Sequence, residues 1–197
     1  MVADPAELRR ALNATALRQA GYFTAQQARA AGYSHQAQNY HVKRGNWTRV
    51  GRGLFRLPDW PETEHEEYVR WRLWSGDRAV VSHESALLLH ELSDVNPSAV
   101  HLTVPPGFRA TAPNAVLHKE SLPQSDVEER AEFRVTTVQR TLLDTAAGTL
   151  SQEQLDTAVS DALDRGLVTP RQLRTRADRH GERAALRIER ALGAANR

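Results

Sequence analysis

Apolar residues recur at helical spacing close to the start of the chain. Leu8, Leu12 and Ala16 are four residues apart, so they share one face of a helix. Asp4 precedes this helix as an N-cap, and Gly21 offers a left-handed position at which the chain can leave it. The pattern therefore predicts a first amphipathic helix between these two residues.

Two shorter helices follow, each with a capping residue at its start and a glycine at its end. Thr24 precedes the segment AQQARAA, which Gly32 closes, and Ser34 precedes HQAQNYHVKR, which Gly45 closes. Two short helices joined by a tight glycine turn form a candidate helix-turn-helix. The third helix would be the recognition helix.

Polar side chains gather on one side of this third helix. Gln36, Asn39, Tyr40 and Lys43 lie at positions i, i+3, i+4 and i+7 and therefore share a face. Amides read base edges, whereas phenol and ammonium groups contact phosphates. The same pattern describes a solvated helix face, so the helix alone leaves both interpretations open. The opposite side holds Ala37, Gln38, His41 and Val42.

The segment WTRVGRGLFRL follows at once. Two strand-favouring runs across Gly-Arg-Gly predict a hairpin with Arg52 at its tip. A hairpin behind a recognition helix is the wing of a winged helix, and its tip can reach a phosphate or the minor groove. We predict DNA contacts from nine residues: Ser34, His35, Gln36, Asn39, Tyr40, Lys43, Arg44, Arg49 and Arg52.

Charge is distributed unevenly along the chain and favours DNA as the partner of this segment. Residues 8–58 contain no Asp or Glu. Residues 1–60 hold nine Lys and Arg against three Asp and Glu, whereas residues 61–197 hold 17 against 21. Carboxylates near phosphates would cancel the attraction of the arginines, so their absence from the predicted winged helix fits a polyanionic partner.

The prolines of LPDWPETE place a domain boundary near Pro61. Beyond it, the runs AVVSH, VHLTVPP, AVLHKE and AEFRVTT read as strands, ESALLLHEL reads as a short helix, and the pattern becomes helical after Thr137. The predicted fold class is α+β: a winged helix-turn-helix domain, residues 1–60, then a mixed α/β domain, residues 61–197, with a small sheet and a helical tail. Within that tail, LDRGLVTPRQL reads as an αα-hairpin in preference to a second helix-turn-helix.

Several classes of protein are disfavoured by what the sequence lacks. There is no cysteine, no secretory h-region and no stretch approaching 18 apolar residues, so we expect a cytoplasmic protein without a membrane partner. GxSxG, P-loop and Rossmann glycine patterns are missing, and no histidine lies in a compact metal-ligand motif. We therefore expect no catalytic residues, no metal, no cofactor and no enzymatic activity.

These residues resemble a known family. The segment LRQAGYFTAQQARAAGYSHQAQNYHVKRGNWTRVGRGLFRL is similar to the winged helix of the AbiEi antitoxins of type IV toxin–antitoxin systems, and SHESALLLHEL, VHLTVP and VTTVQRTLLDTA are similar to the domain that follows it. Gln38 and His41 stand where relatives often carry aliphatic residues. The resemblance marks seven positions of the second domain: His83, Ser85, His90, His101, Arg140, Thr141 and Asp144.

The resemblance implies a repressor and antitoxin. Such proteins bind inverted repeats in their own promoter, with one protomer expected on each half-site, and they oppose a nucleotidyltransferase-like toxin, in many members without a stable complex. An alternative is a winged-helix transcription regulator whose second domain senses a ligand, with no toxin partner. An enzyme in the acidic half is a third hypothesis, and it would need a cluster of perturbed ionisable groups in a cleft.

Overall fold

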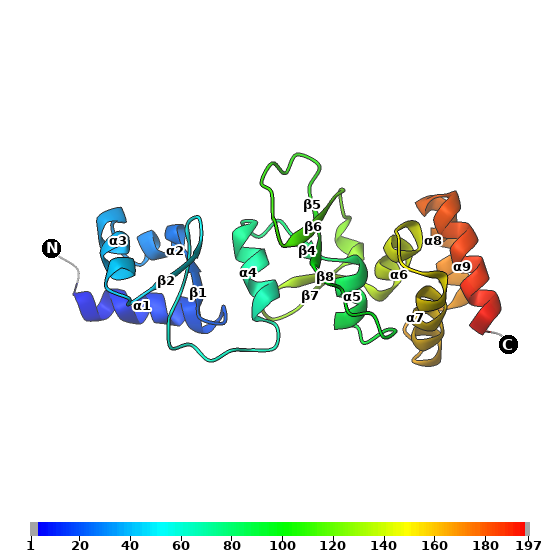
Figure 1. Ribbon diagram of the computed structural model, residues 1–197, viewed down its shortest axis with the longest axis horizontal. Coiled ribbons are helices and arrows are strands. Elements are labelled where there is room, and N and C mark those ends of the chain that lie inside the picture. The colour runs from blue at the N-terminus through cyan, green and yellow to red at the C-terminus, as the bar shows by residue number, and fades with distance from the viewer. Residues whose placement is uncertain (1–3, 196–197) are drawn as a thin grey trace. The chain divides into compact units, whose positions relative to one another are not determined.

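The computed structural model of the protein describes residues 4–195. The chain divides into two compact units, which are drawn in Figure 1. The first unit holds the chain up to Asp77 together with Ala131–Phe133, and the second holds Arg78–Arg130 and the chain from Arg134 onward.

The first unit has the element order of a winged helix, as predicted. Its elements are α1 (Pro5–Leu17), β1 (Tyr22–Thr24), α2 (Ala25–Ala30), α3 (His35–Lys43), β2 (Thr48–Gly51), β3 (Leu54–Arg56) and α4 (Glu66–Trp74). The three strands form an antiparallel sheet in the order β1-β3-β2. The sequence pattern did not reveal β1, because its three residues lie between two helix signals.

The predicted capping residues begin all three helices of the winged helix. The side chains of Asp4, Thr24 and Ser34 accept hydrogen bonds from backbone N–H groups in the first turns of α1, α2 and α3. Thr24 forms a capping box with Gln27. These local hydrogen bonds explain why the helix starts could be read from sequence, although α1 ends at Leu17, earlier than Gly21 suggested.

Aromatic side chains form the core of the winged helix. Phe23, Trp47 and Phe55 are each at most 5% exposed, and the rings of Phe23 and Trp47 meet edge to face at 4.9 Å. A second cluster joins Leu54 of β3 to Val69 and Leu73 of α4. Because of that cluster, α4 packs with the winged helix, and the compact unit extends beyond Pro61 to Asp77.

The second unit combines a mixed sheet with a bundle of helices, also as predicted. Its first half contains β4 (Val80–Val81), α5 (His83–Leu89), β5 (Val100–Val104), β6 (Ala115–Lys119), β7 (Val127–Glu129) and β8 (Arg134–Thr136). The strand order is β6-β5-β4-β8-β7, and the pairs β5–β6 and β4–β8 are parallel. The strand β7 was not predicted from the sequence; its residues Glu128 and Glu129 are exposed.

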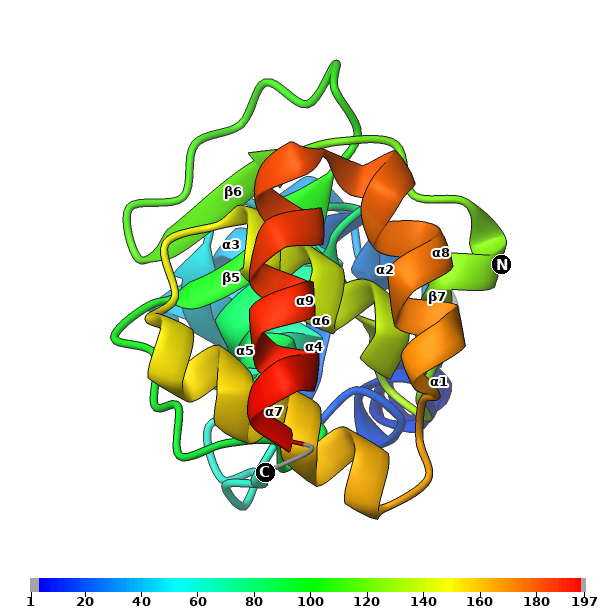
Figure 2. The same ribbon diagram turned by 90° about the vertical axis from the view of Figure 1, so that its right-hand side faces the viewer.

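Four helices complete the second unit: α6 (Val138–Ala147), α7 (Gln152–Asp164), α8 (Pro170–His180) and α9 (Glu182–Ala195). Figure 2 shows α9 lying over α6 with α7 and α8 on either side. Leu142, Leu155, Leu173 and Ile188, one from each helix, are fully buried in one cluster. The segment LDRGLVTPRQL forms the turn between α7 and α8 that the αα-hairpin interpretation requires.

Candidate nucleic-acid interface and the motif residues of the second unit

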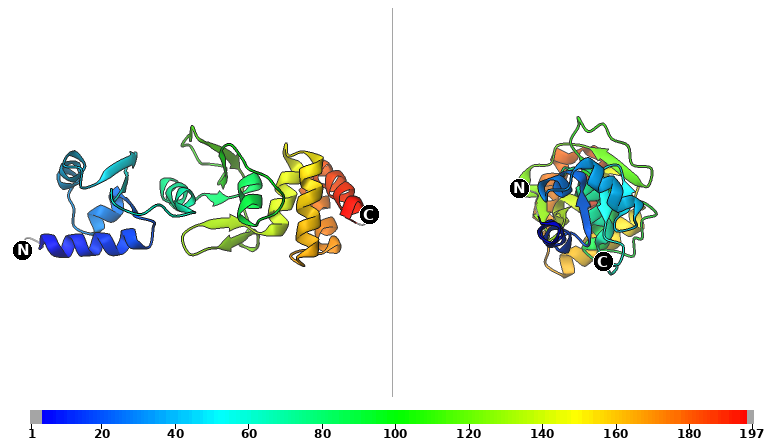
Figure 3. Two further views of the ribbon diagram at one scale, coloured as in Figure 1. Left: turned by 60° about the horizontal axis from the view of Figure 1, so that its bottom comes forward. Right: turned by 90° about the vertical axis from the view of Figure 1, so that its left-hand side faces the viewer.

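The outward face of α3 carries the polar residues predicted for it. Gln36 and Lys43 are exposed, Tyr40 is 54% exposed, and Asn39 is half-buried. Figure 3 shows α1 and α3 along opposite sides of the first unit. A row of amide, phenol and ammonium groups therefore lies open on a helix that α1 does not cover.

Two polar residues hold the inward face of α3 in place, at positions where aliphatic residues are usual. Gln38 is 2% exposed, and its Nε2 donates to the carbonyl oxygens of Ala25 (3.2 Å) and Tyr33 (3.1 Å). The His41 ring stacks on Trp47 with 4.8 Å between centroids. These contacts determine the rotation of α3 about its axis and leave the opposite face outward.

The wing is tied to the recognition helix by a side-chain bridge. Nη2 of Arg49, on β2, donates to Oδ1 of Asn39, on α3, over 3.2 Å. The Arg49 guanidinium also lies 5.2 Å from the centre of the Phe55 ring. Nδ2 of Asn39 in turn lies 3.3 Å from Nδ1 of His35. Asn39 is thus held in place, but its amide oxygen is already occupied by Arg49.

The tip of the wing is a tight turn between β2 and β3. Gly53 has a φ of +67°, which favours glycine. The register shifts between Arg49 and Gly51, and Arg52 is exposed. At the other end of α3, Arg44 is exposed and lies 5.5 Å from the Tyr40 ring centre. Ser34 is also exposed, and its hydroxyl caps the helix. All nine predicted contact residues thus belong to α3, its caps or the wing.

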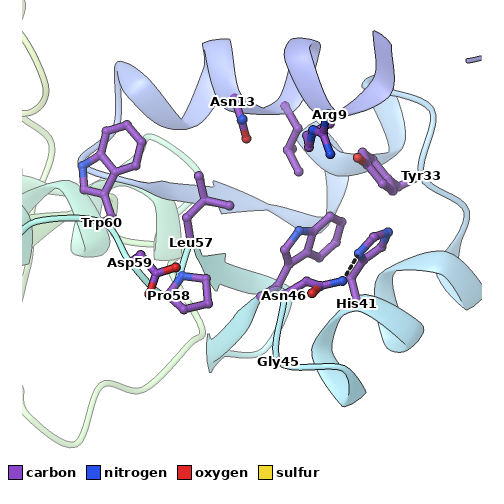
Figure 4. Close-up of a pocket in the computed structure, with 12 residues that line it drawn as sticks. Arg9, Asn13, Tyr33, His41, Gly45, Asn46, Leu57, Pro58, Asp59 and Trp60 are labelled. Atoms are coloured by element: carbon purple, nitrogen blue, oxygen red, sulfur yellow. Dashed lines mark hydrogen bonds between the residues drawn. The ribbon is translucent and has the colours of Figure 1, made fainter. Parts of the chain in front are cut away.

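A pocket of about 590 Å³ lies behind α3 in the first unit (Figure 4). Arg9 and Asn13 of α1 line one wall, Trp60 lines another, and His41 lies at the side of α3. Burial lowers the pKa of His41, and Nδ1 of this ring lies 3.0 Å from Nδ2 of Asn46. The ring is therefore neutral at pH 7, so the charge of α3 is carried by its outward and C-terminal side chains.

Three of the seven motif residues of the second unit meet at another pocket. His83, at the start of α5, His101 on β5 and Asp144 on α6 line a cavity of about 700 Å³. Glu84 and His118 line it as well, and the sequence analysis did not assign them to this site. Glu84 follows His83 directly. His118 lies two residues beyond Val116, the parallel partner of His101, so strand pairing brings it to the same face.

The other four motif residues have structural roles inside the second unit. Ser85 Oγ accepts from the backbone N–H of His101 (2.9 Å), and Thr141 Oγ1 donates to the Thr136 carbonyl (3.2 Å). His90 Nε2 donates to the same carbonyl over 2.8 Å. These bonds join α5, the sheet and α6.

Arg140 is the centre of a buried ion-pair network. It is 4% exposed, and its guanidinium nitrogens lie 2.6 Å from Glu120, 2.7 Å from Asp144 and 3.3 Å from Asp126. Arg176 approaches Asp126 at 2.6 Å. Arg140 and Asp144, four residues apart on α6, therefore pair in the interior, where removing one partner is far more costly than at a surface.

Two kinds of feature are absent from residues 4–195. No group of three or more His, Asp or Glu side chains there is arranged to hold a metal ion. No helix in the same range is both long and apolar enough to cross a membrane.

A three-stranded wing sheet behind an exposed helix, with no acid between residues 8 and 58, places the first unit in the winged-helix class. Within that class, residues 10–58 match the family described as transcriptional regulator, AbiEi antitoxin. The resemblance expected from the sequence is therefore confirmed in this segment.

The whole chain is similar in fold to a solved structure. The crystal structure of the RV2827C protein from Mycobacterium tuberculosis superimposes with a TM-score of 0.66, at 13% identity, over 99% of this chain and 79% of that one. At this identity the similarity concerns the fold alone. No curated protein matches the chain in sequence.

Proposed function

We propose that this protein is the DNA-binding antitoxin of a type IV toxin–antitoxin system. It represses its own operon by binding inverted repeats in the promoter, and it counteracts a nucleotidyltransferase-like toxin in the cytoplasm. One observation supports the proposal of DNA binding. The outward face of α3 and the wing carry Gln36, Asn39, Lys43 and Arg52 in a segment without carboxylates. The family match over residues 10–58 supports the antitoxin half.

The residues of this face divide between base readout and phosphate contact. Gln36 and Asn39 carry amides that can pair with adenine in the major groove. Lys43, Arg44 and Arg52 supply the positive charge that neutralises phosphates. Asn39 releases Arg49 when it reads a base, since its Oδ1 accepts from that guanidinium in the free protein. Two protomers on one palindromic site would place two such helices one helical turn apart.

Replacing Lys43 and Arg52 together with alanine tests the DNA-binding half. We expect weaker binding to a duplex of the upstream promoter region, with a salt dependence reduced by about one unit in log–log slope for each lost phosphate contact. Fluorescence anisotropy at salt concentrations from about 50 to about 200 mM measures both the affinity and its salt dependence. The matched control is Arg190→Ala, an exposed arginine of α9. An unchanged affinity and slope in the double variant would exclude the proposed interface.

The antitoxin half is tested by co-expression with a neighbouring nucleotidyltransferase-like gene. The Lys43→Ala, Arg52→Ala double variant should still restore growth while losing repression of a promoter reporter, since the two tasks are assigned to different units. Failure of the intact protein to restore growth would refute the antitoxin role without touching DNA binding.

One observation favours the alternative of a ligand-sensing regulator. The second unit contains a pocket of about 700 Å³ with several ionisable side chains, which is a size typical of small-molecule sites. A bound small molecule in the purified protein, with no neighbouring toxin gene, would favour that function over the antitoxin.

A further inference from the structure

The pocket of the second unit is built by four elements that converge on it. His83 and Glu84 begin α5, His101 lies on β5, His118 lies on β6, and Asp144 comes from α6. His83 has a φ of +52°, a left-handed conformation that residues other than glycine rarely adopt. Such strain persists only where surrounding contacts enforce it, and it clusters at functional sites.

Two imidazoles of the pocket, those of His83 and His118, are neutral at pH 7. The rings of His83 and His118 stack at 3.4 Å between centroids, with 10° between their planes. Burial lowers the pKa of His83 to about 4 and also lowers the pKa of His118. His101 Nδ1 lies 2.7 Å from Glu84 Oε2 and 3.2 Å from His118 Nε2.

Carboxylates supply the charge of the pocket. Burial raises the pKa of Glu84, but the contact with His101, a backbone hydrogen bond and the nearby His83 together outweigh burial, so the pKa is below its ordinary value and Glu84 is ionised. Asp144 is 2% exposed. Its Oδ1 lies 2.7 Å from Arg140 Nε and 3.2 Å from His180 Nε2, whereas its Oδ2 is buried without a hydrogen-bond partner. Such buried oxygens are nearly always paired, which indicates a missing donor.

The nearby arginines already have acceptors, and one of these acceptors is Asp144 Oδ1. Arg140 is shared among Glu120, Asp126 and Asp144, and Arg183 and Arg187 donate to the Gly148 carbonyl at the end of α6. None of the described residues that line the pocket is Lys or Arg. The pocket therefore offers hydrogen-bond acceptors, two carboxylates and a flat imidazole stack to a bound group.

From this arrangement we infer that the pocket binds a guanidinium group. A planar guanidinium can stack on an imidazole face while donating to Asp144 Oδ2 and to Glu84. A metal ion is a poorer fit, because the ligand atoms in residues 4–195 are not arranged to coordinate one. The group arrives either on a small molecule such as arginine or on an arginine side chain of a partner protein. The inference is independent of whether the chain binds DNA.

Isothermal titration of the full chain with L-arginine tests this site. L-Citrulline has nearly the same shape but no charge, so we expect it to bind at least about tenfold more weakly. N-Acetyl-L-argininamide distinguishes the two sources: weaker binding than free arginine indicates a small-molecule ligand, and equal or tighter binding indicates a side chain of a partner.

Two variants locate the binding in the pocket. Glu84→Gln and Asp144→Asn should each weaken arginine binding by about tenfold or more, while Glu129→Gln on β7 should leave it unchanged. Because Asp144 also pairs with Arg140, a thermal melt checks that its variant is folded, and Glu84→Gln carries the test if it is not. Absence of arginine binding, equal binding of citrulline, or unchanged binding in both variants of the pocket would overturn the inference.

Discussion

Gln38 illustrates how a single buried amide sets the orientation of a whole recognition helix. It lies on the inner side of α3, and its Nε2 donates to two carbonyl oxygens, those of Ala25 and Tyr33. Turning α3 about its axis would break both bonds and leave the buried amide without these partners, at a cost of about 1–3 kcal/mol. The outward direction of Asn39 and Lys43 follows from this constraint.

Replacing Gln38 with leucine should therefore destabilise the first unit. The leucine fills similar space, but it removes the two hydrogen bonds that Gln38 Nε2 donates, so we expect the free energy of unfolding to fall by about 1–3 kcal/mol in urea titrations. Gln36→Leu is the control, because Gln36 is exposed and surface substitutions change stability by no more than about 0.5 kcal/mol. Equal stability of the two variants would show that Gln38 does not anchor α3.

In the second unit, the contribution of Arg140 to stability likewise depends on its burial. Its three acidic partners come from the loop after β6, the short 3-10 helix Gln124–Asp126, and α6 itself. A surface pair of this spacing would contribute little to stability. In the interior, however, the negative charge of each carboxylate is balanced by the Arg140 guanidinium. Arg140 therefore holds together segments that are far apart in the sequence.

At the scale of elements, the winged helix depends on close approach between its segments. Arg49 links β2 to α3, and Leu57 N donates to Gly21 O, which joins the end of the wing to the end of α1. Gly21 has a φ of +80°, and a Cβ at this position would lie 2.3 Å from Cγ of Trp60. The glycine is thus required both by its backbone conformation and by the packing of Trp60.

Gly21→Ala and Gly45→Ala separate these two requirements. Gly45 also has a positive φ, of +76°, but no atom lies within 4 Å of a Cβ added there. We expect Gly45→Ala to cost about 1 kcal/mol, from backbone strain alone. Gly21→Ala should cost about 2 kcal/mol more, because Trp60 must move. Thermal or urea unfolding measures both, and an equal loss in the two variants would contradict the packing argument.

At the scale of the molecule, charge is distributed unevenly between the two halves of the chain. The winged helix lacks acids from residue 8 to residue 58, and most carboxylates lie in the second unit. The second unit buries several of them beside arginines and histidines, with Asp126 and Asp144 almost inaccessible. A basic surface and an interior of compensated charges are thus assigned to different compact units.

The buried histidines make the stability of the protein depend on pH. His83 has a pKa of about 4 in the folded chain against 6.5 when unfolded. Between these values only the unfolded state binds the proton, so stability is complete above pH 6.5, falls by up to about 3 kcal/mol as the pH is lowered to 4, and levels off below. Urea unfolding from pH 7.5 to 4 measures this. His83→Asn, which tolerates the left-handed conformation, should show a smaller loss; an identical profile would exclude His83 as its source.

The sequence by itself determined the local features of this protein. The helix starts at Asp4, Thr24 and Ser34, the glycine tip of the wing and the outward row on α3 depend on residues within a few positions of one another, and local hydrogen bonds and periodicity suffice to predict them. The winged-helix class followed from their order.

Only the tertiary structure decided which distant residues meet. Strand β1 is fixed by pairing with β3, and α4 joins the first unit through contacts with Leu54. Both arrangements depend on contacts between residues more than ten positions apart, so the local sequence pattern did not predict them. Likewise, His118 reaches His101 through the β5–β6 register, and Asp144 reaches them from α6. The chemistry of the pocket thus arises from long-range packing, whose energy is shared among elements and leaves no periodic signal in any one of them.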